Sequence, residues 1–219
     1  GMESAITAIN NHLLDKYLTK PIENEHDFTI SIRHLLQRFQ MQRTIMEQTT
    51  AIHALYGFSN ALNAMDDFDE TLDSIVQFTQ ETLQCERASV LMMDGAHLHL
   101  VASRGLPTED TVSARIALGE RGRDELFRSR NAVLAQTVEA LPFLEGNEAH
   151  PPSAFMITPA LFASLASTEQ PLGMIHVSGR AAGHPFTETD VGILTYIANT
   201  ASIAVNNQVN RRALQSAFS

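Results

Sequence analysis

The sequence predicts an α+β fold in which a central antiparallel sheet of five or six strands is flanked by helices, behind a long N-terminal helical extension. Three observations predict it. Apolar residues recur at helical spacing near both ends of the chain, whereas alternating or β-branched apolar runs fill the middle. Between two of these runs stands Asp94-Gly95, a strong signal for a hairpin turn.

The composition bounds the class of protein. The chain has 219 residues, enough for one sizeable core and an appended segment. Its 25 acidic and 15 basic residues give a net charge of -10, which disfavours direct nucleic-acid binding. One cysteine cannot form an internal disulfide, and no long apolar run predicts a membrane span. We therefore expect a cytoplasmic protein that binds neither nucleic acid nor membrane.

The N-terminal region, residues 2–57, is predicted to be a helical extension. Residues 2–18 are expected to form a short helix that ends before Pro21. Asp27 is expected to cap a much longer helix that reaches about Ala64, with a three-four apolar repeat along it. We predict that this helix forms a parallel homodimer, packed with the last helix of the chain. The alternative is that residues 2–48 fold back over the same domain.

The next elements are a helix and a hairpin. Asp66 or Asp69 is expected to begin a helix over residues 66–84. Its predicted buried face comprises Leu72, Ile75, Val76, Thr79 and Leu83. Strands are then predicted over 87–93 and 97–103, joined at Asp94-Gly95.

The region after the hairpin is less regular. Residues 107–117 have room for a short helix. The remaining expected elements are a helix at 124–128, a weak strand at 132–135, a helical turn within 138–144, a loop at 145–152 and strands at 153–163 and 171–179.

The start of the last helix has several independent signals. Thr187 is a good N-cap, and Asp190, three residues later, completes a capping-box pattern. Phe186 and Val191 occupy the positions of a hydrophobic staple. An apolar stripe of Val191, Leu194, Ala198, Ala201 and Val205 follows, and the helical pattern continues past Val209. The end of this helix could therefore project and pass on a conformational change.

The segment PFTETDVGILTYIANTASIAVNN resembles the last helix of GAF domains. The other blocks follow in the family's order: an acidic helix, CERASVLMMDGAHLHLVASRGLP, a Gly-x-x-Gly stretch and PLGMIHVSG. The resemblance implies a GAF domain with a PAS-like sandwich over residues 58–207, and it leaves residues 208–219 as the helix end and tail. It also implies a small-molecule pocket on the sheet face opposite the terminal helices.

The candidate ligand-binding residues combine strand alternation with this resemblance. Alternation puts Ser89 on one face of its strand, and it puts Met174, His176 and Ser178 together on the last strand. We expect this more polar set to face the pocket, because the helices need an apolar platform. The full set is Ser89, Arg121, Arg123, Phe127, Phe155, Met174, His176 and Ser178. The alternatives are a local hydrogen bond for His176, a solvated basic face for the arginines and ordinary core packing for the phenylalanines.

Nothing in the sequence supports catalysis, and no cofactor is identified. His97 and His99 share a strand face but lack a third ligand at matching spacing, so no metal site is predicted. Cys85 stands alone where a helix meets a strand, and it has no resolving thiol. The Asn-Lys…Phe…Asp-Glu motif of cyclic-nucleotide-binding GAF domains is missing.

The sequence therefore predicts a dimeric, cytoplasmic sensory domain that binds an unidentified small molecule and transmits the signal through its terminal helices. Such a domain needs a downstream signalling protein or a fused effector. The alternative is a ligand-free dimerisation and docking module, in which methionine side chains such as Met92 and Met174 fill the former pocket.

Overall fold

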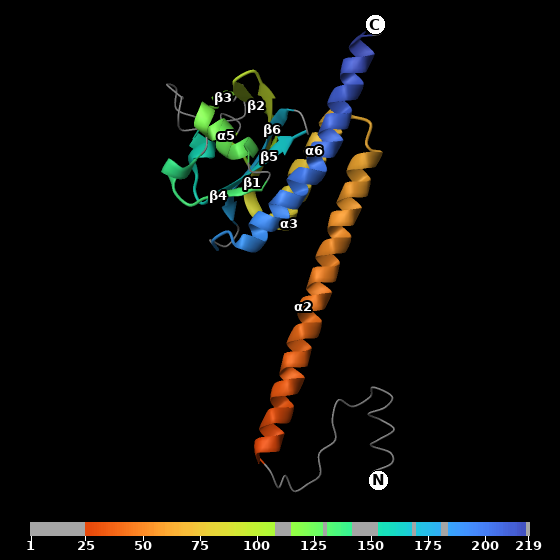
Figure 1. Cartoon of the computed structure of the whole chain (residues 1–219), viewed down its shortest axis with the longest axis vertical. Coiled ribbons are helices and arrows are strands. Elements are labelled where there is room, and N and C mark those ends of the chain that lie inside the picture. The colour runs from red at the N-terminus through yellow and green to blue at the C-terminus, as the bar shows by residue number, and fades with distance from the viewer. Residues whose placement is uncertain are drawn as a thin grey trace. The chain divides into compact units, whose positions relative to one another are not determined.

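The computed structural model describes residues 25–107, 115–128, 131–141, 153–167, 170–180 and 184–217 (Figure 1). The boundary between two compact units falls between Ala54 and Leu55. The helix expected at 2–18 and the loop expected at 145–152 lie outside the described residues. None of the helices in the described ranges combines the length and apolar character needed to cross a bilayer.

A single long helix, α2, runs from Glu25 to Ala64, over 40 residues. It ends where the sequence predicts, but it begins before Asp27, so the expected cap at that residue is wrong. Gly57 lies within the helix and is exposed, with open space where a side chain would start.

The centre of the domain is one six-stranded antiparallel sheet with the order β3-β2-β1-β6-β5-β4. The α+β prediction is confirmed. The strands are β1 (Cys85–Asp94), β2 (His97–Arg104), β3 (Arg115–Ala117), β4 (Val133–Ala135), β5 (Ala160–Ala166) and β6 (Pro171–Arg180). Because β6 lies between β1 and β5, it is an interior strand with neighbours on both edges.

The predicted hairpin between β1 and β2 is confirmed, but its turn lies one residue later than expected. Asp94 still pairs with His97, so the turn residues are Gly95 and Ala96. Gly95 has a φ of 61°, which glycine adopts without a steric penalty. The register shifts after Val90, where the pairing skips Val101 on β2.

Two predictions about the strands are wrong. The sequence did not reveal β3, whose three residues are too few to show alternation. The strand expected at 153–163 is instead a 3-10 helix, η2 (Ser153–Met156), followed by β5 from Ala160. Short apolar runs do not distinguish helix from strand by their pattern, and the run at Ala154–Met156 is such a case.

The smaller helical elements follow the prediction more closely. Helix α5 (Glu120–Arg128) begins four residues earlier than expected. The predicted helical turn is the 3-10 helix η1 (Val138–Ala140).

Helix α3 (Phe68–Leu83) buries the face that its sequence predicts, with the addition of Thr71. Its N-cap is Asp67, neither Asp66 nor Asp69: the Asp67 Oδ1 atom accepts a hydrogen bond from the Glu70 amide at 2.8 Å. Aspartates occupy positions 66, 67 and 69, and their spacing alone does not determine which of them caps the helix.

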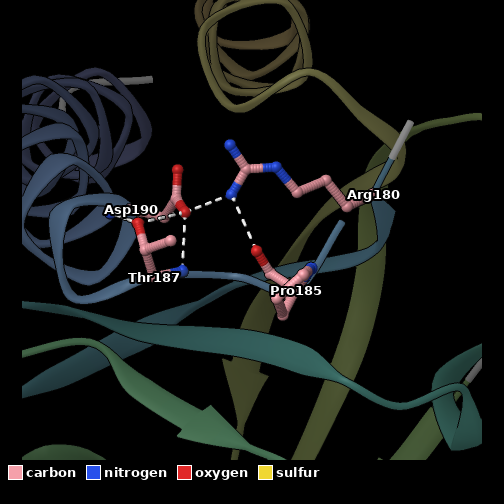
Figure 2. A network of polar contacts seen from close by, with 4 residues as sticks. All are labelled: Arg180, Pro185, Thr187 and Asp190. Carbon is pink, nitrogen blue, oxygen red and sulfur yellow. Dashed lines mark hydrogen bonds and ion pairs between the residues drawn. The ribbon is translucent and has the colours of Figure 1, made fainter. Parts of the chain in front are cut away.

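Helix α6 (Glu188–Ala217) begins at the capping box that the sequence predicts. Figure 2 shows the Asp190 carboxylate accepting hydrogen bonds from the Thr187 amide and hydroxyl, each at 2.7 Å. The same carboxylate oxygen forms an ion pair with Arg180, at the end of β6. Asp190 is only 5% exposed, so this contact ties the last strand to the start of the last helix in a largely buried setting.

Apolar side chains form a core on each face of the sheet. Helices α3 and α6 cover one face, and α5 lies on the other (Figure 1). The end of α2 packs on α3, where the rings of Phe58 and Phe78 stack. The helix-side core includes Val90, Ile175 and Val177 from the central strands. The opposite core includes Leu91, Met174, Phe155 and Phe162. The sheet therefore separates two packed layers with different residues.

We predict that Arg180→Ala lowers the free energy of unfolding by about 1–3 kcal/mol, because it leaves the buried Asp190 carboxylate without its cation. Urea unfolding at constant m-value measures this change. The matched control is Arg128→Ala, which breaks an exposed i,i+4 pair with Asp124 and should cost less than about 0.5 kcal/mol. Equal effects of the two substitutions would contradict this role for Asp190.

Candidate functional site

The candidate site lies on the sheet face opposite α3 and α6, where strand β6 presents its more polar side. Ile175 and Val177 belong to the helix-side core, whereas Met174 belongs to the opposite core. His176 and Ser178 share the face of Met174 by alternation. The predicted division of β6 into two faces is therefore confirmed.

His176 is fully buried between two aromatic rings. Its ring centroid lies 5.0 Å from that of Phe155 and 5.1 Å from that of Phe162. The His176 Nδ1 atom is 3.3 Å from the Ser89 hydroxyl, its hydrogen-bonding partner on β1. The other ring nitrogen, Nε2, is buried and has no hydrogen-bond partner within the described part of the chain.

The same burial keeps His176 neutral. Removal from solvent lowers the pKa of the imidazole from 6.5 to about 3, and the positive charge of Arg87 acts in the same direction. A neutral imidazole carries a proton on one of its two ring nitrogens, and the tautomer determines which one. Nε2 is therefore a donor in one tautomer and an acceptor in the other. His176 is therefore a neutral hydrogen-bonding group at physiological pH.

Two further unpaired polar atoms lie beside His176. Ser178 pairs with Arg87 across the strands, as His176 pairs with Ser89. The Ser178 Oγ atom and the Arg87 Nε atom are both buried, and neither has a hydrogen-bond partner among the described residues. We call Arg87, Ser89, His176 and Ser178 the polar cluster.

The energetic cost of this arrangement is substantial. A buried polar group left without a partner costs about 1–3 kcal/mol, and native proteins contain few of them. Three such atoms on neighbouring positions of one sheet face therefore require an explanation beyond packing. The arrangement can supply hydrogen bonds to a polar group that enters from this side of the sheet.

Arg123, one of the predicted residues of α5, lies away from the polar cluster. An Arg123 guanidinium nitrogen is 3.4 Å from the Gly95 carbonyl oxygen, in the turn of the β1–β2 hairpin. Asp94, at that end of β1, is five residue steps from Ser89, which is about 16 Å at strand spacing. Phe127 packs against the core on this face. Arg121 lies in α5, but its side chain is outside the described residues.

Sequence reasoning missed Arg87 and Phe162. Arg87 stands two residues before Ser89, so the alternation that selected Ser89 also selects Arg87. Phe162 was hidden by the incorrect strand bounds at 153–163, because the start at Ala160 sets which residues share its face.

Cys85 is not disposed to act as a nucleophile. Burial raises the pKa of its thiol to about 11, so the reactive thiolate is scarce at neutral pH. The two histidines of β2 have polar neighbours nearby. His99 Nε2 is 3.2 Å from the Asp94 carboxylate but forms no hydrogen bond within the described part of the chain, and His97 Nδ1 is 3.5 Å from Arg115. Among the described residues no group of three or more potential ligands could hold a metal ion.

The family follows from a sequence comparison. The model of the GAF domain family matches residues 66–206, and the chain belongs to this family. GAF domains are typically sensory or regulatory and bind small ligands. A comparison with curated protein sequences found no significant match.

Solved structures share the fold at low sequence identity. A segment of a methyl-accepting chemotaxis protein, residues 122 to 287, is 22% identical with a TM-score of 0.56, over 69% of this chain and 96% of that segment. The GAF domain of a phosphoenolpyruvate-protein phosphotransferase from Coxiella burnetii is 17% identical with a TM-score of 0.58, over 74% and 96%. A free methionine-R-sulfoxide reductase from Neisseria meningitidis is 16% identical with a TM-score of 0.54, over 74% and 91%. These likenesses establish the fold alone.

The burial of neutral His176 predicts a specific pH dependence. Its folded pKa of about 3 lies below the ordinary 6.5, so between these values the unfolded chain binds the extra proton. Stability from this residue is complete above pH 6.5 and is lost as the pH falls towards 3, with a slope of up to about 1.4 kcal/mol per pH unit.

Urea unfolding of His176→Phe across this pH range should show a shallower acid slope than the wild type. The control, His184→Phe, replaces an exposed histidine and should keep the wild-type slope. A wild-type slope in His176→Phe would mean that His176 is not held neutral by the fold.

Proposed function

We propose that this protein is a cytoplasmic, non-catalytic GAF-type sensor that binds a small molecule at the polar cluster and passes the signal through its terminal helices in a homodimer. The observation that carries the proposal is the pair of fully buried side chains, His176 and Ser178, with unpaired polar atoms on the sheet face opposite those helices. A bound ligand would form hydrogen bonds with these atoms. It would therefore stabilise the packing of this face in which those hydrogen bonds are made.

A physical route connects the polar cluster with α6. His176 and Ser178 lie on β6, and two residues after Ser178 the same strand ends at Arg180, which binds Asp190 in the first turn of α6 (Figure 2). Arg180 also donates to the Pro185 carbonyl at 3.3 Å, in the connection to that helix. A shift of β6 on ligand binding would therefore move the start of α6. A downstream protein or a fused effector would read the change.

The long helices support a dimer. On α2 the side chains of Ile32, Leu36 and Phe39 are 41%, 57% and 65% exposed, an unusual exposure for large apolar residues in a helix. They line a groove of about 300 Å³ together with Leu35, Arg38 and Gln42. A second copy of the helix would bury this stripe in the manner of a coiled coil.

The second candidate function is a ligand-free dimerisation and docking module. It is favoured by the methionines on the polar-cluster side, since Met174 is fully buried there and Met93 and Met156 pack beside it. Flexible methionine side chains fill irregular space well. In this alternative His176 is a core residue held by Ser89 and two aromatic rings.

Native mass spectrometry of freshly purified protein tests the proposal. We expect a dimer that carries additional small-molecule mass, and we expect His176→Phe to lose that mass while it remains folded and dimeric. The same variant at exposed His184 is the control and should retain the mass. A dimer without added mass in the wild type, together with unchanged behaviour of His176→Phe, would favour the docking module.

The dimer has its own variants in the same spectra. Leu35→Asp combined with Phe39→Asp should give monomers, because it places charge on the apolar stripe of α2. His34→Asp combined with Gln37→Asp adds the same charges to exposed positions away from the stripe and should leave the dimer intact. A dimer mass in the first variant would contradict dimerisation through this stripe.

A further inference from the structure

We propose that the polar cluster binds the carboxylate of a small organic acid whose remaining body is apolar. The inference rests on the proposed ligand-binding function and narrows it to a chemical class. Its basis is the donors that the cluster offers, the charge beside them and the apolar side chains around them.

The unpaired atoms of the cluster can all donate. The Arg87 Nε atom is a donor only, because a guanidinium has no acceptor. The Ser178 hydroxyl can donate, and His176 Nε2 donates when the Ser89 hydroxyl donates to Nδ1 and fixes the tautomer. A carboxylate accepts through two oxygens and about four lone-pair positions, so it can satisfy all three donors.

The charge near the cluster selects an anion. Arg87 supplies a positive charge close enough to lower the pKa of His176. Its guanidinium is partly balanced by Glu86 at 3.4 Å, but the Glu86 carboxylate is 58% exposed and contacts Nη1, which leaves Nε unpaired. Hydrogen bonds between an arginine and a carboxylate are about twice as strong as those between neutral groups.

The surroundings of the cluster are apolar. Phe155 and Phe162 flank the imidazole, and Leu91 and Met174 are buried on the same face. An ammonium would be repelled by the charge of Arg87. A fully hydrophilic ligand would exchange its water contacts for these apolar side chains without compensation. An acid with an aromatic or aliphatic body would place its carboxylate at the cluster and its body against these side chains.

Nuclear magnetic resonance of the full chain tests the chemical class. Ring nitrogen-15 signals of His176 are followed during titration with benzoate and hexanoate, and separately with benzamide, hexanamide and hexylammonium. We expect the two acids to shift the Nε2 signal of the neutral, Nε2-protonated ring, and to bind at least about tenfold more tightly than the amides, which is about 1.4 kcal/mol.

Arg87→Met should weaken the binding of both acids at least about tenfold while the amides are little affected, because it removes the charge and keeps the length of the side chain. Arg104→Met is the matched control. It changes an exposed arginine of the neighbouring strand that bonds Gln77 on α3, and it should bind the acids like the wild type.

The outcomes separate this inference from the function on which it rests. If the amides or hexylammonium shift the His176 signals as strongly as the acids, the cluster binds a ligand but the class is wrong. If Arg87→Met binds the acids unchanged, the role of the charge is wrong. If no carboxylate perturbs His176 at millimolar concentration, the inference fails, and the retained mass in native spectra then decides the proposed function independently.

Discussion

The two cores and the polar cluster all depend on the burial of strand β6 on both of its faces. An interior strand with period-two alternation must send every second side chain into a different layer, so one short segment serves two environments. Ile175 and Val177 face the helices, where any polar group would be costly. Polar side chains on this strand therefore gather on the opposite face, and His176 and Ser178 are there together with Arg87 from β1.

The ion pair between Arg180 and Asp190 connects the end of β6 to the first turn of α6. One carboxylate caps α6 through Thr187 and binds Arg180, so the start of the helix and the end of β6 share a partner. The cap of the helix and the position of the strand end are therefore not independent. A displacement of Arg180 would disturb the Asp190 carboxylate, which also accepts the capping hydrogen bonds of Thr187. This shared carboxylate is a local, contiguous link through which the proposed ligand-binding face would be coupled to the helix.

The sequence predicts the fold well where local chemistry decides. The capping box at Thr187 and Asp190 and the division of β6 into two faces both depend on near neighbours, and the structure has them as expected. It predicts less where distant pairing decides. Strand β3 forms by pairing with β2, which its own three residues do not predict. Strand β5 begins at Ala160, after the 3-10 helix that ends at Met156. For the candidate site, alternation along β6 predicts that His176 and Ser178 share a face. The α5 arginines are included in the prediction because they flank a predicted helix start, and spacing along a chain does not reveal that Arg123 reaches the hairpin turn.

The central claim is that the polar cluster and the start of α6 are coupled through β6. Native-state hydrogen exchange of the Val191 amide, which donates the first helical bond to the Thr187 carbonyl at 3.1 Å, tests it most directly. The account predicts that His176→Phe changes the protection of this amide relative to the wild type, and that the change disappears when Arg180→Ala is already present. Protection at Val191 that is the same in the wild type and in His176→Phe, with all differences confined to the sheet, would contradict the coupling.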